Sequence, residues 1–138
     1  MIYIDTCVIV SYVDEADPNH QRALRLVSRL GGDRVVSILS LVELASVYSR
    51  AGFGEPLALA FYSVKKVRAR VARLDFNEVL REAFARAPAL RLRTLDLLHL
   101  VACGVLGCRE FATLDTEVVK RSEAISRELG VTVVTETS

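Results

Sequence analysis

The sequence is poor in the residues and patterns that mark several classes of protein. It has only three prolines, and with 51% hydrophobic and 25% charged residues its composition excludes a disordered or collagen-like chain. No apolar run approaches the length that spans a bilayer, so we expect no membrane segment. The opening run Met1–Ile4 has no basic stretch before it, so we also expect no signal peptide.

Cysteine and histidine are also scarce. The three cysteines, Cys7, Cys103 and Cys108, are an odd number without metal-site spacing, so we expect reduced thiols that simply pack in a cytoplasmic protein. There is no glycine-rich phosphate loop, no Gly-x-Ser-x-Gly turn and no Cys/His pairing, which argues against nucleotide-binding proteins and serine hydrolases. His99 follows Asp96 by one helical turn and could be a ligand, but we favour a buried, hydrogen-bonded histidine.

Basic residues concentrate in the middle of the chain. Residues 65–93 hold nine Lys or Arg and three acids, whereas the whole chain has a net charge of only +1. Arginine suits bidentate contacts with phosphate, so this band is a modest indication of an RNA-binding surface. Solvated helix faces, or contact with an acidic partner segment, explain it equally well. The candidates for RNA contact are Lys65, Lys66, Arg68, Arg70, Arg91 and Arg93.

Strand and helix patterns alternate along the chain. The expected strands are an opening run that ends at Asp5 and residues 35–38, 71–74, 110–114 and 131–134. The expected helices cover residues 18–30, 40–52, 56–67, 78–87, 95–104 and 117–129, with a capping box at Ser40 and Glu43, a cap at Thr94 and a stop at Pro88. Apolar strands between helices predict a three-layer α/β/α sandwich with a central parallel sheet of about five strands, in one domain over residues 1–138. We expect the apolar residues of 57–62 to pack in its core.

Acidic residues gather where these strands end. The carboxyl ends of parallel strands meet at one edge of a sheet, so four acids are expected there: Asp5, Glu43, Asp96 and Asp115. Clustered carboxylates repel one another unless a cation compensates them. Oxygen ligands favour Mg²⁺ or Mn²⁺ over zinc, and such ions can drive phosphodiester hydrolysis.

Each of these acids also has a structural explanation. Glu43 could complete a capping box, Asp96 could complement a helix dipole, and Asp115 could cap the last helix. Asp5 is harder to explain in this way, because a charge at the end of an apolar strand is unfavourable unless it is paired or coordinated. Taken together, the four acids favour a site.

Four short stretches spread over the chain carry a family resemblance. They are Ile4-Asp5-Thr6, Ser40-Leu41-Val42-Glu43-Leu44-Ala45, Leu95-Asp96-Leu97-Leu98-His99-Leu100 and Phe111-Ala112-Thr113-Leu114-Asp115. As an ordered set they resemble the motifs of PIN-domain nucleases and, within that family, of the VapC-type toxins of toxin–antitoxin pairs. The resemblance implies an endoribonuclease that depends on Mg²⁺ or Mn²⁺, with a metal-binding catalytic quartet made of Asp5, Glu43, Asp96 and Asp115.

The resemblance also implies supporting residues and partners. The hydroxyls of Thr6 and Thr113 would orient carboxylates or a bound water. RNA would be the substrate, and a small antitoxin protein and a second copy of the chain would be the partners. The chain departs from the family at Glu117, where many relatives have a second aspartate, although this longer side chain could still reach a metal. It also has Val118 where a phenylalanine is common.

Two alternative functions are compatible with a small α/β domain of this kind. A PIN-like domain that binds nucleic acid or protein without turnover stays open, and metal titration would distinguish it. A phosphoryl-accepting α/β domain is disfavoured, because such domains use paired acids at the first strand and this chain has only Asp5 there.

Overall fold

Strand β1 (Ile2–Ile4) lies at the centre of a five-stranded parallel sheet with the order β3-β2-β1-β4-β5. The computed structural model describes residues 1–137. The other strands are β2 (Arg34–Val36), β3 (Ala69–Val71), β4 (Glu110–Ala112) and β5 (Thr132–Val134). All of β1 is buried, because it has a paired strand on each edge and helices on each face.

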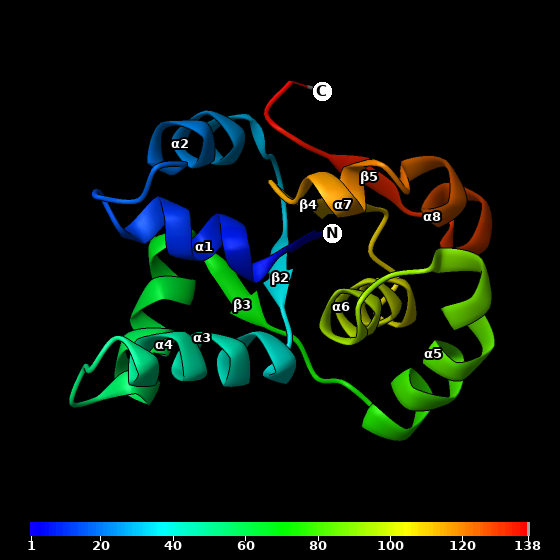
Figure 1. Cartoon of the computed structure of the whole chain (residues 1–138), viewed down its shortest axis with the longest axis horizontal. Coiled ribbons are helices and arrows are strands. Elements are labelled where there is room, and N and C mark those ends of the chain that lie inside the picture. Colours follow the sequence, from blue (N-terminus) through cyan, green and yellow to red (C-terminus); the bar gives the residue numbers. More distant parts are fainter. Residues whose placement is uncertain (138) are drawn as a thin grey trace.

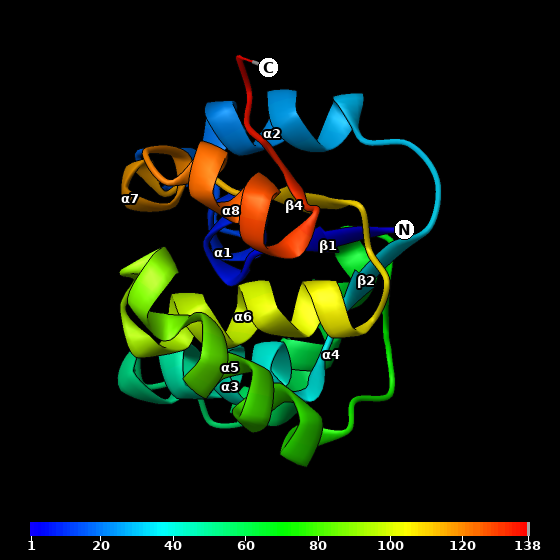
Figure 2. The ribbon, with the colours of Figure 1, turned by 90° about the vertical axis from the view of Figure 1, so that its right-hand side faces the viewer.

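Helices cover both faces of this sheet (Figure 1). They are α1 (Thr6–Val13), α2 (His20–Arg29), α3 (Ile38–Arg50), α4 (Pro56–Lys66), α5 (Phe76–Leu90), α6 (Thr94–Val105), α7 (Thr116–Val119) and α8 (Ser122–Leu129). Helices α1 to α4 pack on one side and α5, α6 and α8 on the other, the side that faces the viewer in Figure 2. The predicted three-layer α/β/α sandwich with a parallel sheet is therefore confirmed.

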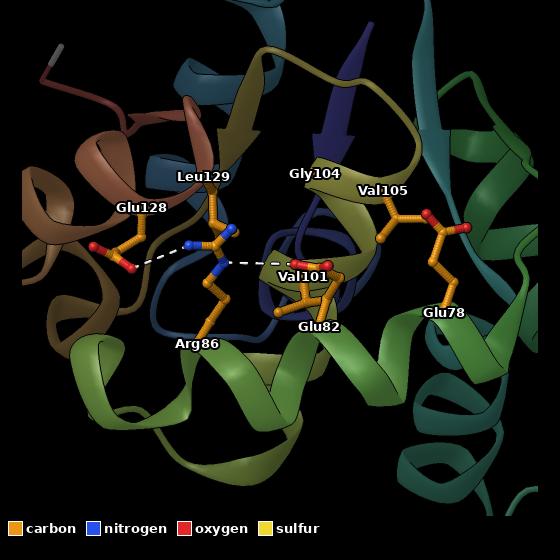
Figure 3. A pocket seen from close by; sticks show the side chains of 8 residues that line it. All are labelled: Glu78, Glu82, Arg86, Val101, Gly104, Val105, Glu128 and Leu129. Carbon is orange, nitrogen blue, oxygen red and sulfur yellow. Dashed lines mark hydrogen bonds and ion pairs between the residues drawn. The ribbon is translucent and has the colours of Figure 1, made fainter.

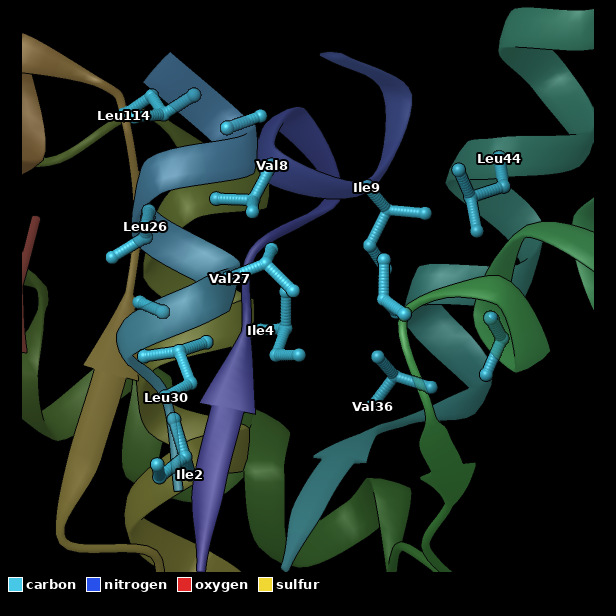
Figure 4. Close-up of a cluster of buried hydrophobic side chains, with 14 of the residues drawn as sticks. Ile2, Ile4, Val8, Ile9, Leu26, Val27, Leu30, Val36, Leu44 and Leu114 are labelled. Carbon is cyan, nitrogen blue, oxygen red and sulfur yellow. The ribbon is translucent and has the colours of Figure 1, made fainter. Parts of the chain in front are cut away.

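The side chains of β1 point alternately into two hydrophobic cores, as the pleat of a strand requires. Ile2 and Ile4 join the core under α1 to α4, together with Val8 of α1 (Figure 4). Tyr3 joins the second core, where its ring stacks on Phe111 with the centroids 5.6 Å apart. The chain therefore reaches Asp5 from a strand that is fixed by apolar contacts on both sides.

Helix α1 is the main element that the sequence prediction lacks. The expected strand ends at Asp5, and the apolar residues after it carry no recognisable cap, so no helix is predicted there. The chain nevertheless turns into a helix at Thr6, because this turn buries Val8 and Ile9 completely in the first core. Tertiary packing here outweighs the modest helix propensity of β-branched residues.

The start of α3 corrects the predicted capping box. Ser37 is the N-cap, and the Ser40 hydroxyl accepts a hydrogen bond from the backbone N–H of Ser37 at 3.2 Å. The helix therefore begins at Ile38, and Ser40 is its third residue rather than its cap. Glu43 consequently lies in the second turn of α3 and takes no part in the capping box.

Helix α5 continues past the predicted stop. Pro88 lies inside the helix, which ends at Leu90, with Arg91 as C-cap in the left-handed conformation at φ 53°. The proline removes a single backbone donor close to the end of the helix, and the complete burial of Leu90 compensates for it. The loop before α6 is therefore only residues 91–93, shorter than the expected 88–93.

Other boundaries shift by a few residues. Helix α2 begins at His20 rather than at Pro18, β3 begins at Ala69 rather than at Val71, β4 ends at Ala112, Arg93 rather than Thr94 caps α6, and the last predicted helix is divided into α7 and α8. These differences do not alter the order of the elements.

The outer face of α4 corrects the prediction that residues 57–62 pack in the core. Leu57, Phe61 and Tyr62 are 56%, 51% and 52% exposed, whereas Ala60 and Val64 are the residues that pack inward. Helix α4 therefore carries apolar side chains on both its buried face and its exposed face.

Within residues 1–137, no helix is long and apolar enough to cross a membrane.

Candidate metal centre

Asp5 directly follows β1 at the carboxyl edge of the sheet and is only 5% exposed. Its Oδ2 atom accepts hydrogen bonds from the Thr113 hydroxyl at 2.8 Å and from the Cys7 thiol at 3.4 Å. Burial raises the pKa of Asp5, and the neighbouring Glu43 carboxylate raises it further, while His99 and the two hydrogen bonds oppose the rise. Cys7, which we expected only to pack, is therefore a neighbour of this carboxylate.

Thr113 links Asp5 to the end of β4. Its hydroxyl donates to Asp5 and accepts the backbone N–H of Asp115 at 3.0 Å. The Asp115 carboxylate accepts the N–H of Glu117 at 2.9 Å, so it does cap α7 through one oxygen atom. The side chain of Glu117 is 63% exposed and pairs with Lys120 at 3.3 Å, which draws it toward solvent. Thr113 thus contacts the carboxylate of Asp5 and the backbone of Asp115, whereas the side chain of Glu117 contacts Lys120.

Glu43 reaches the same edge from α3 and meets His99 from α6. Its Oε1 atom lies 2.9 Å from His99 Nε2, and ligand atoms of Asp5, Glu43 and His99 all lie within 4.8 Å of one another. Burial alone would raise the pKa of Glu43, but the His99 hydrogen bond and the neighbouring Thr6 hydroxyl outweigh it and hold the pKa below its usual value. Glu43 is therefore held as a carboxylate beside Asp5.

Asp96 approaches the group from the first turn of α6. Its pKa is raised to about 6 by burial and then by the charges of Asp5, Asp115 and Glu43. Asp96 therefore feels the charges of the other three predicted acids, but among the described residues only Asp5, Glu43 and His99 have ligand atoms within 4.8 Å of one another. Within residues 1–137, no Lys or Arg forms an ion pair with any of the four acids.

The residues present fit a divalent cation. The group offers carboxylate oxygens from the ends of β1 and β4 and from α3 and α6. Among residues 1–137 no Lys or Arg forms an ion pair with them, and Arg50 acts on Glu43 only at longer range. In addition, Thr6 Oγ1 is buried beside Glu43 and makes no hydrogen bond of ordinary length with the described part of the chain. A bound ion or its water would satisfy both the charge and this hydroxyl.

The predicted RNA-binding residues divide between the two edges of the sheet. Arg91 and Arg93 precede α6, and therefore lie at the carboxyl edge with Asp96. Arg70 instead pairs with Asp33 at 2.8 Å, just before β2, so it lies at the amino edge. The other basic candidates, at the end of α4 and in the turn before β3, lie at that amino edge too: Lys65, Lys66 and Arg68.

Tyr3 is a residue of this region that the sequence prediction missed. Its hydroxyl lies 2.7 Å from His99 Nδ1 and 2.8 Å from Ser37 Oγ. His99 itself is 1% exposed and hydrogen-bonded on both nitrogens, as the prediction of a buried histidine requires. A tyrosine in the middle of an otherwise aliphatic central strand was the available signal, since a buried hydroxyl needs a partner.

A separate hollow between α5, α6 and α8 contains another group of acids (Figure 3). There Arg86 pairs with Glu82 at 3.5 Å and with Glu128 at 3.3 Å. These acids have a cationic partner, unlike the four at the sheet edge. The group is therefore explained as an ion-pair network that joins α5 to α8.

Comparisons with known proteins agree with this fold. A family model described as PIN domain matches residues 2–124. VapC20 of Mycobacterium tuberculosis, described as a sarcin–ricin loop cleaving toxin, superposes with a TM-score of 0.70 at 15% identity, covering 87% of this chain and 94% of that one. VapBC-1 of nontypeable Haemophilus influenzae gives 0.68 at 16% identity over 100% of both chains. VapBC2 of Rickettsia felis, bound to a promoter DNA fragment, gives 0.67 at 15% identity over 97% and 98%. No curated protein matches the sequence.

Proposed function

We propose that this chain, which belongs to the PIN domain family, is a Mg²⁺- or Mn²⁺-dependent endoribonuclease that hydrolyses RNA phosphodiester bonds. One observation carries this proposal. Asp5 and Glu43 lie together at the carboxyl edge of the sheet, and their charges and that of Asp115 raise the pKa of Asp96. No Lys or Arg of residues 1–137 forms an ion pair with any of these four acids. A purely structural cluster would be expected to contain its own counter-charge, as the Arg86 network does.

The side chains divide the work as follows. Asp5, Asp96 and Asp115 would hold the metal, and Glu43 would either join them or orient the attacking water. When bound, the metal supplies a Lewis acid for the phosphate and lowers the pKa of water near it. Thr113 keeps Asp5 in place through its 2.8 Å hydrogen bond. The Thr6 hydroxyl faces Glu43, where it would form a hydrogen bond with the attacking water. Water rather than a side chain would attack the phosphorus and the 3′-oxygen would leave, so the expected products are a 5′-phosphate and a 3′-hydroxyl.

The RNA backbone would approach from the loop between α5 and α6. Arg91 and Arg93 stand there beside the first turn of α6, which carries Asp96. Two exposed arginines at the rim of an acidic group can draw a phosphate chain toward it without neutralising the acids themselves. The four basic residues at the amino edge are too far along the sheet to share this task.

The test of the proposal is cleavage of a structured RNA by the purified protein in the presence of MnCl₂. We expect Asp96→Asn to lose at least about a hundredfold in rate, since it removes one metal-binding charge and preserves shape. The matched control is Glu123→Gln, because Glu123 is also an acid in the first turn of a helix but lies away from the site. Equal rates for the wild type and Asp96→Asn would refute the assignment of the site.

The alternative is a PIN-like module that binds RNA or protein without turnover. It predicts that the wild type binds RNA yet cleaves none, and that Mn²⁺ leaves its melting temperature unchanged. The proposed nuclease predicts an increase with Mn²⁺, because a ligand that binds only the folded state stabilises it. The thermal shift therefore distinguishes the two functions even before the RNA target is known.

We also propose that a small antitoxin protein and a second copy of the chain are the partners, as in a cytoplasmic toxin–antitoxin pair. VapBC-1 and VapBC2 are neighbours of this fold. The exposed apolar face of α4 continues into Lys65 and Lys66, which form no ion pair within the described residues. A surface of this kind suits an acidic, apolar antitoxin segment, whereas two copies would oppose like charges across a two-fold axis.

A second hollow, between α5 and α6 and distinct from the one in Figure 3, suits the second copy better. Phe84 is 83% exposed, and the side chains around it, including Leu80 and Leu98, are apolar. An uncharged patch can meet its own image without repulsion. We therefore expect Phe84→Ser to convert a dimer into a monomer in sedimentation experiments, while Phe61→Ser on α4 leaves the dimer intact. The opposite result would assign the dimer interface to α4 and the antitoxin surface to the hollow around Phe84.

A further inference from the structure

A chain of hydrogen bonds runs behind Glu43 and returns to the helix that carries it. Ser37 at the start of α3 contacts the Tyr3 hydroxyl of β1 at 2.8 Å, and this hydroxyl contacts His99 Nδ1 of α6 at 2.7 Å. His99 Nε2 then contacts Glu43 Oε1 at 2.9 Å. Three elements that supply acids to the site are thus joined by one buried network.

The direction of the hydrogen bond to Glu43 follows from its acceptor. The Glu43 carboxylate can only accept, so His99 Nε2 carries a proton and donates it. The Tyr3 hydroxyl can donate to His99 Nδ1 in the neutral ring and accept from it in the imidazolium, because a hydroxyl is both a donor and an acceptor. The Ser37 hydroxyl rotates freely and can donate to Tyr3 or accept from it. Every polar atom in the network therefore has a partner in either form of the ring.

The network restricts the conformational freedom of the Glu43 side chain. The side chain is 28% exposed and reaches the site from the second turn of α3, so by itself it would sample several rotamers. His99 is 1% exposed, and its ring packs edge-on against Tyr3 of the second core with the centroids 5.7 Å apart, so it is held in place. The hydrogen bond therefore fixes one oxygen of Glu43 and leaves the other oxygen to face the metal or the water.

We propose that Tyr3 and His99 are positioning residues that orient the Glu43 carboxylate for metal binding, and that His99 is not itself a metal ligand. The inference deepens the proposed function and rests on it only for the identity of the site. The ligand atoms of Asp5, Glu43 and His99 lie within 4.8 Å of one another, so His99 could be taken for a third ligand. Under this proposal only the two carboxylates of that group bind the metal. The inference also gives a role to Tyr3, which lies in β1 two residues before Asp5.

The structure offers a matched control for Tyr3. Tyr48 of α3 is also buried and its hydroxyl also contacts a serine, Ser63 of α4, at 2.6 Å. Tyr3→Phe and Tyr48→Phe therefore remove the same group from comparable surroundings, but only the first one borders the site. A merely structural role for Tyr3 predicts the same behaviour for both variants.

The experiment measures the affinity for Mn²⁺ by the electron paramagnetic resonance signal of the free ion. We expect Tyr3→Phe to bind Mn²⁺ about tenfold more weakly and His99→Leu about 10- to 100-fold more weakly, as is usual when the residue behind a ligand is removed. Tyr48→Phe should stay within about twofold of the wild type. His99→Gln, whose amide nitrogen can still donate to Glu43, should recover most of the loss seen in His99→Leu.

Three results would overturn this proposal. The first is equal Mn²⁺ affinity for the wild type and Tyr3→Phe. The second is an equal loss in Tyr48→Phe, which would make the effect one of general stability. The third is the hyperfine coupling of a directly bonded imidazole nitrogen in the Mn²⁺ spin-echo spectrum, which would make His99 a ligand. Because the readout is metal affinity, a wild type that binds Mn²⁺ but cleaves no RNA would overturn the proposed function and not this network.

Discussion

Replacing Asp96 by asparagine should make the metal-free protein more stable while it destroys the site. In the wild type the pKa of Asp96 is raised from 3.8 to about 6 by burial and by three neighbouring acids, so its ionised form is disfavoured in the fold. Asparagine has the same shape and no charge. Removal of a charge that the folded state opposes therefore stabilises the fold at neutral pH.

The size of the effect follows from that shift. A rise in pKa from 3.8 to about 6 corresponds to about 3 kcal/mol at pH 7, at about 1.4 kcal/mol for each pKa unit. Asp96 is partly exposed, so solvent screening reduces this to about half. Loss of the favourable contact between a charge and the start of α6 subtracts about 0.5 kcal/mol. The net expectation is a gain of about 1 kcal/mol, or an increase of about 3 °C in Tm.

The pH dependence provides an internal check. An acid with a raised pKa binds its proton more tightly in the folded state, so the wild type gains stability as the pH falls from about 6 toward 3.8. Asp96→Asn cannot gain in this way. The difference in Tm between the two proteins should therefore be largest at pH 7 and nearly absent at about pH 4.

The assay is thermal unfolding in EDTA, followed by circular dichroism at both pH values and repeated with MnCl₂. Saturating metal at about a hundred times its dissociation constant should add about 2.7 kcal/mol to the wild type alone, which reverses the order of stability. Glu123→Gln is again the control, and it should be slightly less stable than the wild type under every condition. If Asp96→Asn is less stable than the wild type in EDTA at pH 7, Asp96 merely complements a helix dipole and the cluster is not strained.

Three further predictions concern the rim, a turn and the core. Arg93→Ala should weaken RNA binding and reduce its salt dependence, whereas Arg70→Ala should change neither in a filter-binding assay, because Arg70 is paired at the far edge. Gly130→Ala should lower the free energy of unfolding by about 1 kcal/mol in urea titrations, since Gly130 ends α8 at φ 66°. Leu44→Ala, a fully buried change in the first core, should lower it by about 2–5 kcal/mol in the same titrations.

The sequence was most informative where a charge interrupts an apolar pattern. Asp5, at the end of a central strand, is predicted at the carboxyl edge of the sheet because the order of strands and helices leaves no other position for it. Asp96 and Asp115 follow by the same rule. These are consequences of topology, and topology is what hydrophobic patterning encodes best.

Glu43 shows where local pattern was insufficient. The capping-box rule favours Ser40 as the cap of α3 because Glu43 follows it by three residues, and it places Ser37 in the preceding strand. The choice is made by Tyr3, whose hydroxyl lies 2.8 Å from Ser37 Oγ and 3.4 Å from Ser40 Oγ, 34 and 37 residues away. A contact between distant residues cannot be recovered from a rule that compares neighbours.

The basic band shows a different limit. Its residues are close in sequence, from Lys65 to Arg93, but α4 ends at one edge of the sheet and α6 begins at the other. The charge pattern along the sequence therefore combines two groups of basic residues that lie at opposite edges of the folded sheet. Of the six candidate residues, Arg91 and Arg93 are the two that lie at the same edge as the acids, so the local electrostatic attraction for RNA is smaller than the total charge of the band indicated.

Stability itself can distinguish the two kinds of residue that build this site. A carboxylate that binds metal is held against repulsion in the metal-free fold, so removing its charge should stabilise that fold, as argued for Asp96. A positioning residue such as His99 is fully hydrogen-bonded, so His99→Leu should destabilise the metal-free fold by leaving the Tyr3 hydroxyl and Glu43 without their partner. Both variants should lose affinity for Mn²⁺. A comparison of unfolding in EDTA with metal affinity therefore assigns each polar residue at this edge to one kind or the other, and it does so without knowledge of the RNA target.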